Sequence, residues 1–308
     1  MGGESNWVMV PQMSAKYPQH ASGPVGKQIH HIYRDRLKQF TSNGQYKEQS
    51  LMSKLYDGRL AGEPHVKLSV WDAPDLSRPT FKEATNKANE YRPTKKGEAF
   101  GPSWSTHWFK VQFTLPYEWI YKPQIELHWD SHSEAMVWTE DGKPLQGLTG
   151  NGERTEWVVP KEYRDYNKEH TIYIEMAANG MFGVPTGGDP IQPPDPNRYF
   201  PLTEADLVSV NLDARALYYD FWIIGDGARE FPDDSWQEHQ ALQVCNEIMD
   251  CFIAGEGSRS CIQDCRKIAK KYLGDKVDSE DVYKTETDAI VNAIGNCHID
   301  TCWLWPWA

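Results

Sequence analysis

Several features that mark other classes of protein are missing from this sequence. No apolar run approaches the ~18 residues that a membrane span needs. The first residues carry neither the basic nor the apolar segment of a secretory signal, and no Asn-x-Ser/Thr glycosylation sequence occurs. Lys and Arg form no run beyond short pairs, and the net charge is −12. We therefore expect a cytoplasmic protein without membrane insertion and without nucleic acid as its main partner.

Cysteine is absent from the long N-terminal part of the chain, because all six cysteines lie at or after Cys245. A disulfide scaffold would spread cysteines through the chain, and no pair here has C-x-x-C spacing. Cys261 and Cys265 are one helical turn apart, which suits a reduced core better than a bridge. We expect free and mostly buried thiols.

Helical periodicity is present near the N-terminus and again after residue 228. In 27–40, the apolar residues fall on one helical stripe, and 46–57 gives a second short helical pattern. We assign 1–65 to an N-terminal helical arm. Ser235 and Glu238 have capping-box spacing, which predicts a helix start there. Residues 229–283 are therefore expected to form a helical connector.

Between these helical parts the apolar period is two, and turn residues separate short runs. Such a series favours an antiparallel β-sandwich of jelly-roll, galactose-binding-like type over residues 66–228. The predicted strands are Val66–Trp71, His107–Leu115, Gln124–Asp130, Ala135–Glu140, Thr155–Val159, Thr171–Met176, Leu207–Leu212 and Leu217–Ile224.

A Pro-rich segment, 183–201, interrupts the strands with six Pro and three Gly. A loop of this length is functional or poorly ordered, and its Pro content favours a stiff, extended path. We weigh a structural arm or subunit contact above a binding-site wall.

The last segment, 284–308, carries the residues with the clearest chemistry. The run Ala289–Ile294 predicts a strand buried on both faces, as in a parallel sheet, and ligands bind at the carboxyl ends of such strands. His298 and Asp300 follow there, and their spacing places both side chains on one face of an extended backbone. An imidazole nitrogen and a carboxylate oxygen suit zinc or a similar divalent cation. An isolated His-x-Asp is a weak signal, so a structural role for His298 stays open at this point.

Several segments resemble the glycoside hydrolase family 38 α-mannosidases of the vacuolar and cytosolic type. Residues 295–306 (Gly-Asn-Cys-His-Ile-Asp-Thr-Cys-Trp-Leu-Trp-Pro) are similar to that family's first catalytic motif, usually Gly-His-Cys-His-Ile-Asp-Thr-Ala-Trp-Leu-Trp-Pro. The resemblance extends upstream through His30–Leu37, Gln49–Met52, Gly101–Trp108 and Glu175–Gly183. It covers nearly the whole chain, as the non-catalytic N-terminal region and the first strand of a catalytic α/β barrel.

The resemblance implies a retaining, zinc-dependent enzyme that hydrolyses terminal α-mannose. His298 and Asp300 then correspond to two of four zinc ligands, and Trp303 and Trp305 line or support the sugar site. The family's zinc holds hydroxyls of the mannose, an Asp attacks the anomeric carbon, and a second carboxylic acid protonates the leaving oxygen. The nucleophile and the general acid are expected downstream of this chain.

Two positions depart from the motif, because Asn296 replaces the usual His and Cys302 the usual Ala. Two zinc ligands alone are too few for a tight site. We therefore expect the 308-residue chain to be inactive by itself as a glycosidase.

The resemblance also implies a mannose-containing oligosaccharide as substrate and a homo-oligomer as the assembled form. It further implies a location in the cytoplasm, or in the vacuole or lysosome by a signal-peptide-independent route. A vacuolar-delivery cargo receptor is then expected as a partner. The alternative function is a non-catalytic assembly or carbohydrate-binding module. An unrelated His-x-Asp metallohydrolase is a third and weaker hypothesis.

Overall fold

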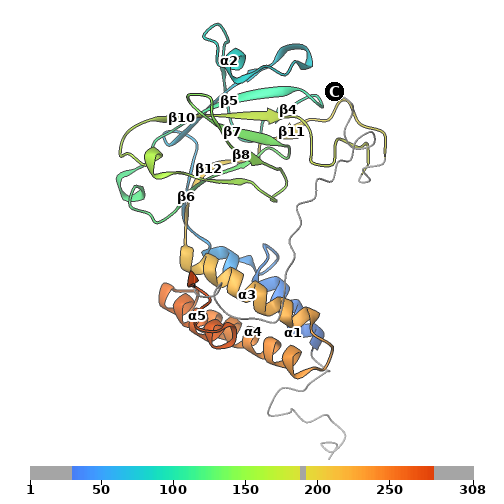
Figure 1. Ribbon diagram of the computed structural model, residues 1–308, viewed down its shortest axis with the longest axis vertical. Coiled ribbons are helices and arrows are strands. Elements are labelled where there is room, and N and C mark those ends of the chain that lie inside the picture. Colours follow the sequence, from blue (N-terminus) through green and yellow to red (C-terminus); the bar gives the residue numbers. More distant parts are fainter. Residues whose placement is uncertain (1–29, 188–191, 281–308) are drawn as a thin grey trace, which may run out of the picture. The chain divides into compact units, whose positions relative to one another are not determined.

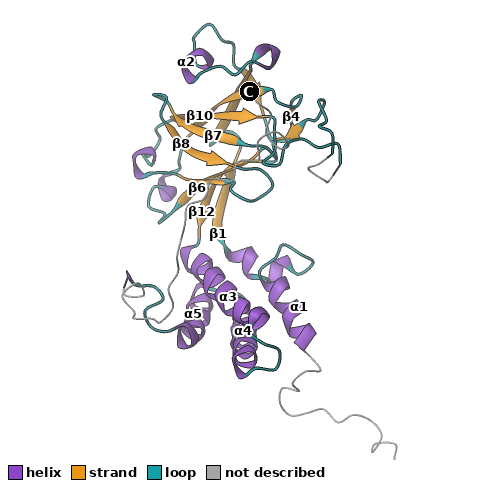
Figure 2. Cartoon of the chain, turned by 45° about the vertical axis from the view of Figure 1, so that its right-hand side comes forward, coloured by secondary structure: helices purple, strands orange, loops and turns teal. Residues whose placement is uncertain are grey.

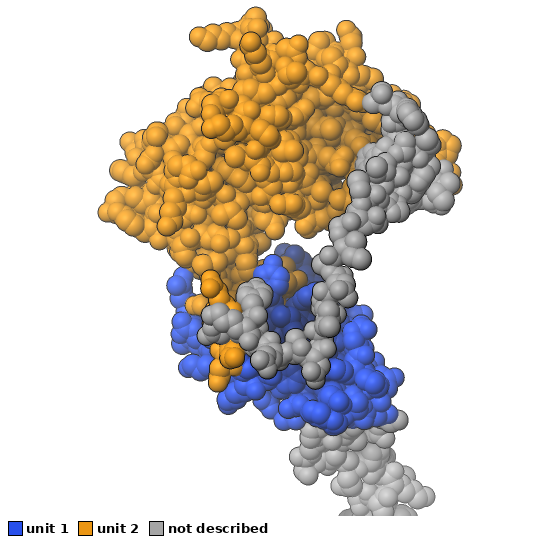
Figure 3. All heavy atoms as spheres, viewed as in Figure 1, with its two compact units in different colours: residues 1–50, 219–274 blue, residues 51–218, 275–308 orange. Residues whose placement is uncertain are grey.

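The computed structural model describes residues 30–187 and 192–280, which divide into two compact units (Figure 3). The described part of unit 1 comprises residues 30–50 and 219–274. Unit 2 comprises residues 51–218 together with 275–280. The four-part division at residues 65, 228 and 283 stays a prediction.

Unit 2 is a β-sandwich in which every strand pairing is antiparallel (Figure 1). One sheet has the order β1 (Tyr56–Ala61), β12 (Glu204–Val210), β6 (Ile125–Asp130), β9 (Glu156–Val158). The other has the order β3 (Arg92–Thr94), β2 (Val66–Asp72), β5 (Thr106–Phe113), β10 (His170–Ala177), β7 (Ala135–Thr139), β8 (Pro144–Leu148). A small third sheet pairs β11 (Phe200–Pro201) with β4 (Ala99–Phe100). The predicted mainly β fold with an antiparallel sandwich is confirmed.

The core of unit 2 follows from alternation along the strands. In β10, buried residues alternate with half-buried ones, so Ile172, Ile174 and Met176 point inward. Phe109 of β5 meets Trp129 of β6 edge-on, with ring centroids 4.8 Å apart. This contact joins the two sheets across the core, where aromatic pairs contribute area and a preferred geometry.

One predicted strand is wrong. Residues Leu217–Ile224 belong to α3 (Leu212–Glu230), so the helical period begins earlier than predicted. The buried apolar side chains of α3 recur at spacings of three and four, which is a helical stripe: Ala214, Leu217, Phe221, Ile224 and Ala228. The other side of the helix exposes Tyr219, Trp222 and Ile223. Because these residues are also apolar, the helical period of the buried residues cannot be recognised in the sequence.

The other differences concern short elements. The predicted helix over 46–57 consists of the 3₁₀ turns Lys47–Gln49 and Leu51–Lys54, followed by β1. Further 3₁₀ turns and one short helix lie in the loops of unit 2: Pro74–Leu76, Tyr117–Trp119, Lys161–Tyr163 and α2 (Phe81–Ala84). The strands β1, β3, β4, β8 and β11 lack a clear alternation of apolar residues and were not predicted.

Unit 1 packs α1 (His30–Phe40), α4 (Trp236–Ala254) and α5 (Arg259–Leu273) with the second part of α3 (Figure 2). Phe40 contacts Phe221 and Phe252, with ring centroids 4.7 and 5.1 Å away. The Ser235 hydroxyl accepts the N–H of Glu238, as the capping pattern predicts, whereas the Glu238 carboxylate accepts the N–H of Asp234. Among the described residues, no helix is both long and apolar enough to cross a membrane.

The described parts of the Pro-rich segment fold back on themselves instead of running extended. The N–H of Thr186 donates to the carbonyl of Pro193, and the N–H of Asp195 donates to that of Val184. The buried Ser103 hydroxyl donates to the Asp195 carbonyl at 2.6 Å and anchors the segment to unit 2. The choice between a binding wall and a subunit contact stays a prediction.

Candidate functional site

The residues predicted to carry the chemistry lie outside the described residues. His298, Asp300, Trp303 and Trp305 all fall in 281–308, as does the predicted barrel strand. Their roles therefore stay predictions, and the candidate sites that can be built from geometry lie elsewhere in the chain.

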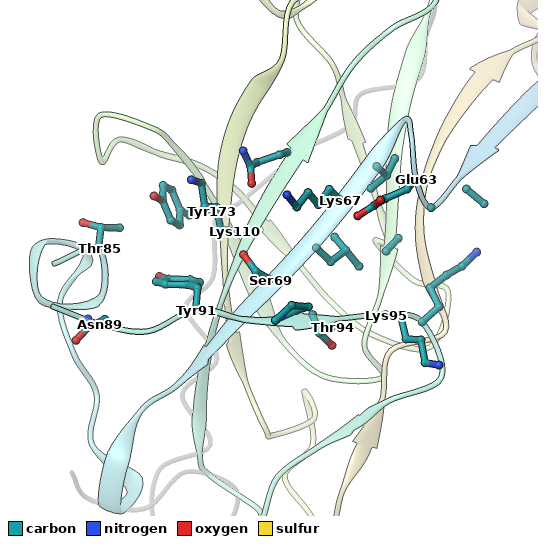
Figure 4. Close-up of a pocket in the computed structure, with 18 of the residues that line it drawn as sticks. Glu63, Lys67, Ser69, Thr85, Asn89, Tyr91, Thr94, Lys95, Lys110 and Tyr173 are labelled. Atoms are coloured by element: carbon teal, nitrogen blue, oxygen red, sulfur yellow. The ribbon is translucent and has the colours of Figure 1, made fainter. Parts of the chain in front are cut away.

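A groove of about 840 Å³ lies on the outer face of the six-stranded sheet of unit 2 (Figure 4). Its floor follows from the same alternation that builds the core, because the residues between the buried ones point outward. Ser69, Lys110 and Tyr173 form one row across β2, β5 and β10, since Lys110 is in register with both of the others. Lys67 and Gln112 form the next row. The sheet thus presents hydroxyl, amide and ammonium groups in one concave surface.

The segment 85–96, which follows α2, forms the side of the groove. Thr80 caps α2 in a complete capping box with Glu83. Phe81 packs on the rings of Trp108, Trp138 and Tyr173, with centroids 5.8, 5.6 and 5.5 Å away. This contact covers the aromatic part of the outer face and leaves the polar part open.

Two polar side chains hold the segment after α2 in place. Asn89 donates to the carbonyls of Glu83 and Ala84, each at 2.7 Å, and the Tyr91 hydroxyl donates to the Ala84 carbonyl at 3.2 Å. Tyr91 and Tyr173 lie at one end of the groove, and Glu63 and Lys95 lie at the other (Figure 4). Burial raises the pKa of both tyrosines, so their hydroxyls are neutral at physiological pH.

Charge distinguishes the groove from the rest of the chain. Its lining includes one acid, Glu63, and five lysines: Lys67, Lys87, Lys95, Lys96 and Lys110. Lys96 is engaged with the buried Asp206 at 2.6 Å. The other four lysines have no ion-pair partner among the residues that the structure describes. In a chain of net charge −12, this groove favours hydroxyl-bearing or anionic ligands.

A second constellation has the connectivity of a Ser-His-Asp triad. Ser105 Oγ lies 2.7 Å from His107 Nε2, and His107 Nδ1 lies 2.6 Å from Asp72 Oδ1. The hydrogen bond from His107 lowers the pKa of Asp72, which keeps that carboxylate ionised. A hollow of about 500 Å³ adjoins the three residues.

The surroundings of Ser105 argue against a nucleophile. The Ser105 hydroxyl is buried and donates a hydrogen bond to the Pro102 carbonyl at 2.6 Å. An oxyanion hole needs free backbone N–H groups near the nucleophile. The N–H groups of Trp104 and Ser105 already donate to the carbonyls of Ala178 and Pro102. We interpret this chain of hydrogen bonds as a structural link between β2 and β5.

A buried charge cluster lies where β6 meets the start of α3. Glu126 is fully buried, and its carboxylate accepts hydrogen bonds from Arg215, from His128 at 3.1 Å and from Gln124 at 2.7 Å. Burial raises the pKa of Glu126, but the hydrogen bonds from Arg215 and His128 outweigh burial and hold that pKa at about 2. The carboxylate oxygens are fully engaged, so we assign Glu126 a structural role.

The described cysteines are free thiols, as predicted. Cys245, Cys261 and Cys265 are buried, and Cys251 is half-buried. The Sγ atoms of Cys251, Cys261 and Cys265 lie within 4.8 Å of one another, a geometry that could hold a metal ion. Cys297 and Cys302 lie outside the described residues.

Comparison with known families places this fold. Residues 63–208 match the family described as "Alpha-mannosidase, jelly roll domain". The match begins just before β2 and ends within β12, so it covers most of the sandwich. Residues 63–208 therefore belong to the family of α-mannosidase jelly-roll domains.

Curated relatives extend this relationship beyond the sandwich. The chain is 40% identical to a protein of Saccharomyces cerevisiae named "Alpha-mannosidase", over 92% of this chain and 28% of that protein. It is 34% identical to "Alpha-mannosidase G" of Dictyostelium discoideum, over 92% of this chain and 25% of that protein. The chain thus spans about a quarter of the length of these relatives. A β-glucuronidase structure from Ruminococcus gnavus covers 50% of this chain and 30% of its own at 14% identity and a TM-score of 0.32, too low to inform the function.

The groove is a feature that the sequence did not reveal. Its floor residues alternate with core residues, and an outward Lys or Gln on a strand looks like any solvated position. Lysines recur at outward positions of β2 and β5, and this recurrence was the available signal. It indicates a shared surface only once the two strands are known to pair.

Proposed function

We propose that the protein to which this chain corresponds is a retaining, zinc-dependent α-mannosidase acting on mannose-containing oligosaccharides. The observation that carries the proposal is the identity of 30–40% to proteins named as α-mannosidases, which extends over 88–92% of this chain. Identity over that length, beyond the jelly-roll domain alone, favours a shared whole-protein activity.

In this proposal, the sandwich supports the catalytic region and the last segment contributes to the metal site. His298 and Asp300 would be two zinc ligands, a donor set of imidazole and carboxylate that suits this ion. Zinc, when bound, would hold the sugar hydroxyls and polarise them. Trp303 and Trp305 would line the mannose. The nucleophile and the general acid would come from sequence downstream of Ala308.

The setting of the enzyme is part of the same proposal. We infer a homo-oligomer in the cytoplasm, with delivery to the vacuole or lysosome through a cargo receptor that needs no signal peptide. A sedimentation-velocity measurement tests the oligomer, and imaging of the tagged protein together with a vacuolar marker tests the delivery.

An assay with an aryl α-mannoside tests the activity. We expect no turnover by the 308-residue chain. We expect turnover by the longer product of the same gene, with loss on chelation and on Asp300→Ala. An inactive longer product would contradict the α-mannosidase proposal. Chelator-sensitive turnover by the 308-residue chain alone would contradict the assignment of the nucleophile to downstream sequence.

The groove supports a second candidate function, a carbohydrate-binding module within the sandwich. Tyr91 and Tyr173 offer apolar ring surface beside neutral hydroxyls, and Ser69, Lys67 and Lys110 offer hydrogen-bond donors to sugar hydroxyls. Calorimetric titration of the chain with a mannose oligosaccharide tests this function. An unchanged affinity in the Lys67→Gln, Lys110→Gln double variant would place the sugar elsewhere.

A further inference from the structure

Three cysteine thiols from two helices meet in unit 1. Cys251 lies in the last turn of α4, whereas Cys261 and Cys265 lie one turn apart at the start of α5. Their Sγ atoms all lie within 4.8 Å of one another. Cys251 is half-buried, so this side of the cluster is open to water. Cys245 is buried on α4 outside the cluster.

The backbone brings these thiols together. Gly255 ends α4, and a Cβ at this position would lie 2.6 Å from both Cβ and Sγ of Cys261. Any larger residue would therefore push the start of α5 away from the end of α4. Ser258 caps α5 and accepts the N–H of Cys261, which fixes the first turn. The cluster is thus set by the turn as well as by side-chain packing.

The thiols have the spacing that a thiophilic cation needs. A Zn–S bond is about 2.3 Å, which places two thiolates of a tetrahedral site about 3.8 Å apart. Sγ atoms within 4.8 Å reach that separation through small rotamer adjustments. Three protein ligands with an open fourth position are a known arrangement for zinc. Soft sulfur ligands select zinc over magnesium or calcium.

The protons on these thiols must be displaced by the metal. The Cys261 thiol donates to the Cys251 carbonyl at 3.2 Å, and the Cys265 thiol donates to the Ile248 carbonyl at 3.5 Å. Burial raises the pKa of both thiols, so they are protonated at neutral pH. A bound divalent cation reverses this preference, because its charge deprotonates a coordinating thiol. The N-terminal end of α5 also favours negative charge on Cys261.

We propose that Cys251, Cys261 and Cys265 bind one thiophilic divalent cation of the zinc class, with a water as the fourth ligand beside Cys251. The site uses none of the residues of the predicted His298–Asp300 motif, and it does not depend on the proposed glycosidase activity. Its effect is to join the end of α4 to the start of α5.

Titration of the reduced 308-residue chain with Cd²⁺ tests the proposal, since cadmium–thiolate bonds absorb in the ultraviolet. We expect one Cd²⁺ per chain, with competition by excess Zn²⁺. The unfolding temperature should rise with Zn²⁺ because the ion binds the folded state more tightly than the unfolded state. The Cys261→Ser, Cys265→Ser double variant should lose the absorption. Cys245→Ser, a matched change of a buried thiol on α4, should keep it.

The cysteines outside the described residues provide a further control. The Cys297→Ser, Cys302→Ser double variant should still bind one Cd²⁺, and loss of binding there would overturn the proposal. Retention of binding in the Cys261→Ser, Cys265→Ser variant, or its absence from the wild-type chain, would also overturn it. If that variant fails to fold, the rate of alkylation of Cys251 in the wild-type chain tests the site instead. Zn²⁺ should slow this alkylation several-fold. An unchanged rate would refute the site.

Discussion

The guanidinium group of Arg215 donates to both carboxylate oxygens of Glu126, at 2.5 and 2.9 Å. Both residues belong to unit 2, and the pair ties the first turn of α3 to the middle sheet strand β6. Such a bidentate pair fixes geometry as well as charge. Removing one partner would leave the other charge buried and without compensation.

Arg215→Met is therefore expected to destabilise unit 2 strongly. The Met side chain keeps most of the volume but leaves the Glu126 carboxylate without its main partner, at a cost of about 3–5 kcal/mol. Urea unfolding followed by tryptophan fluorescence measures the change. Arg78→Met provides the control, because Arg78 is exposed. A loss under 1 kcal/mol for Arg215→Met would contradict the assigned role.

The same pair predicts how stability depends on pH. The pKa of Glu126 is about 2 in the folded chain, below its ordinary value of 4.5, so the folded state favours the ionised form. Its contribution is complete above about pH 4.5 and is lost as the pH falls through about 2. The contribution is roughly 3 kcal/mol, because each pKa unit corresponds to about 1.4 kcal/mol. In Glu126→Gln, the free energy of unfolding should depend less steeply on pH at acidic pH. An unchanged dependence would show that other carboxylates dominate the loss of stability in acid.

Gly255→Ala is expected to loosen the junction between α4 and α5. The added methyl would lie 2.6 Å from Cys261, so the turn must shift, at a cost of about 1–3 kcal/mol. Thermal unfolding monitored by circular dichroism of the helices measures this cost. Gly274→Ala is not a fair control, because Gly274 has a positive φ. Ala254→Ser, one residue away at an exposed position, serves instead and should change little.

The groove predicts a charge-dependent affinity. Lys67→Gln with Lys110→Gln should weaken binding of a mannose oligosaccharide about tenfold or more, since two hydrogen bonds from charged donors are lost at about 1 kcal/mol each. Lys161→Gln, an exposed lysine outside the groove, should leave the affinity unchanged. Calorimetry gives both values. Equal weakening by Lys161→Gln would show that only the overall charge matters.

Alternation along strands carried most of the fold prediction. β2, β5, β6, β7 and β10 were placed to within about two residues because each buries one face, and a half-buried strand must alternate. α3 was misread because Trp222 and Ile223 are apolar yet exposed, so the local composition resembled a strand. The packing of α3 against other elements determined that this segment is a helix, and local composition does not encode that packing.

The candidate sites likewise divide into those that local sequence indicates and those that depend on tertiary packing. Cys261 and Cys265 could be paired from their spacing alone, because residues four apart share a helix face. Their proximity to Cys251 depends on the turn at Gly255 and on how two helices pack. The groove likewise requires the pairing of strands that lie far apart in the sequence. The His298–Asp300 prediction rests on a local motif and lies outside the described residues.

The shortness of α2 has a consequence for the groove beside it. A helix of four residues does not persist in water on its own, so α2 exists because Phe81 is packed on the sheet and Thr80 caps it. If Phe81 left the sheet, the segment 85–96 at the side of the groove would be free to move without unfolding of the sandwich. The amides of Ala84 and Thr85, which donate within this turn, should then exchange with deuterium faster than the β5 amides and slow when the groove is filled. Their exchange rates would therefore report whether a sugar occupies the groove.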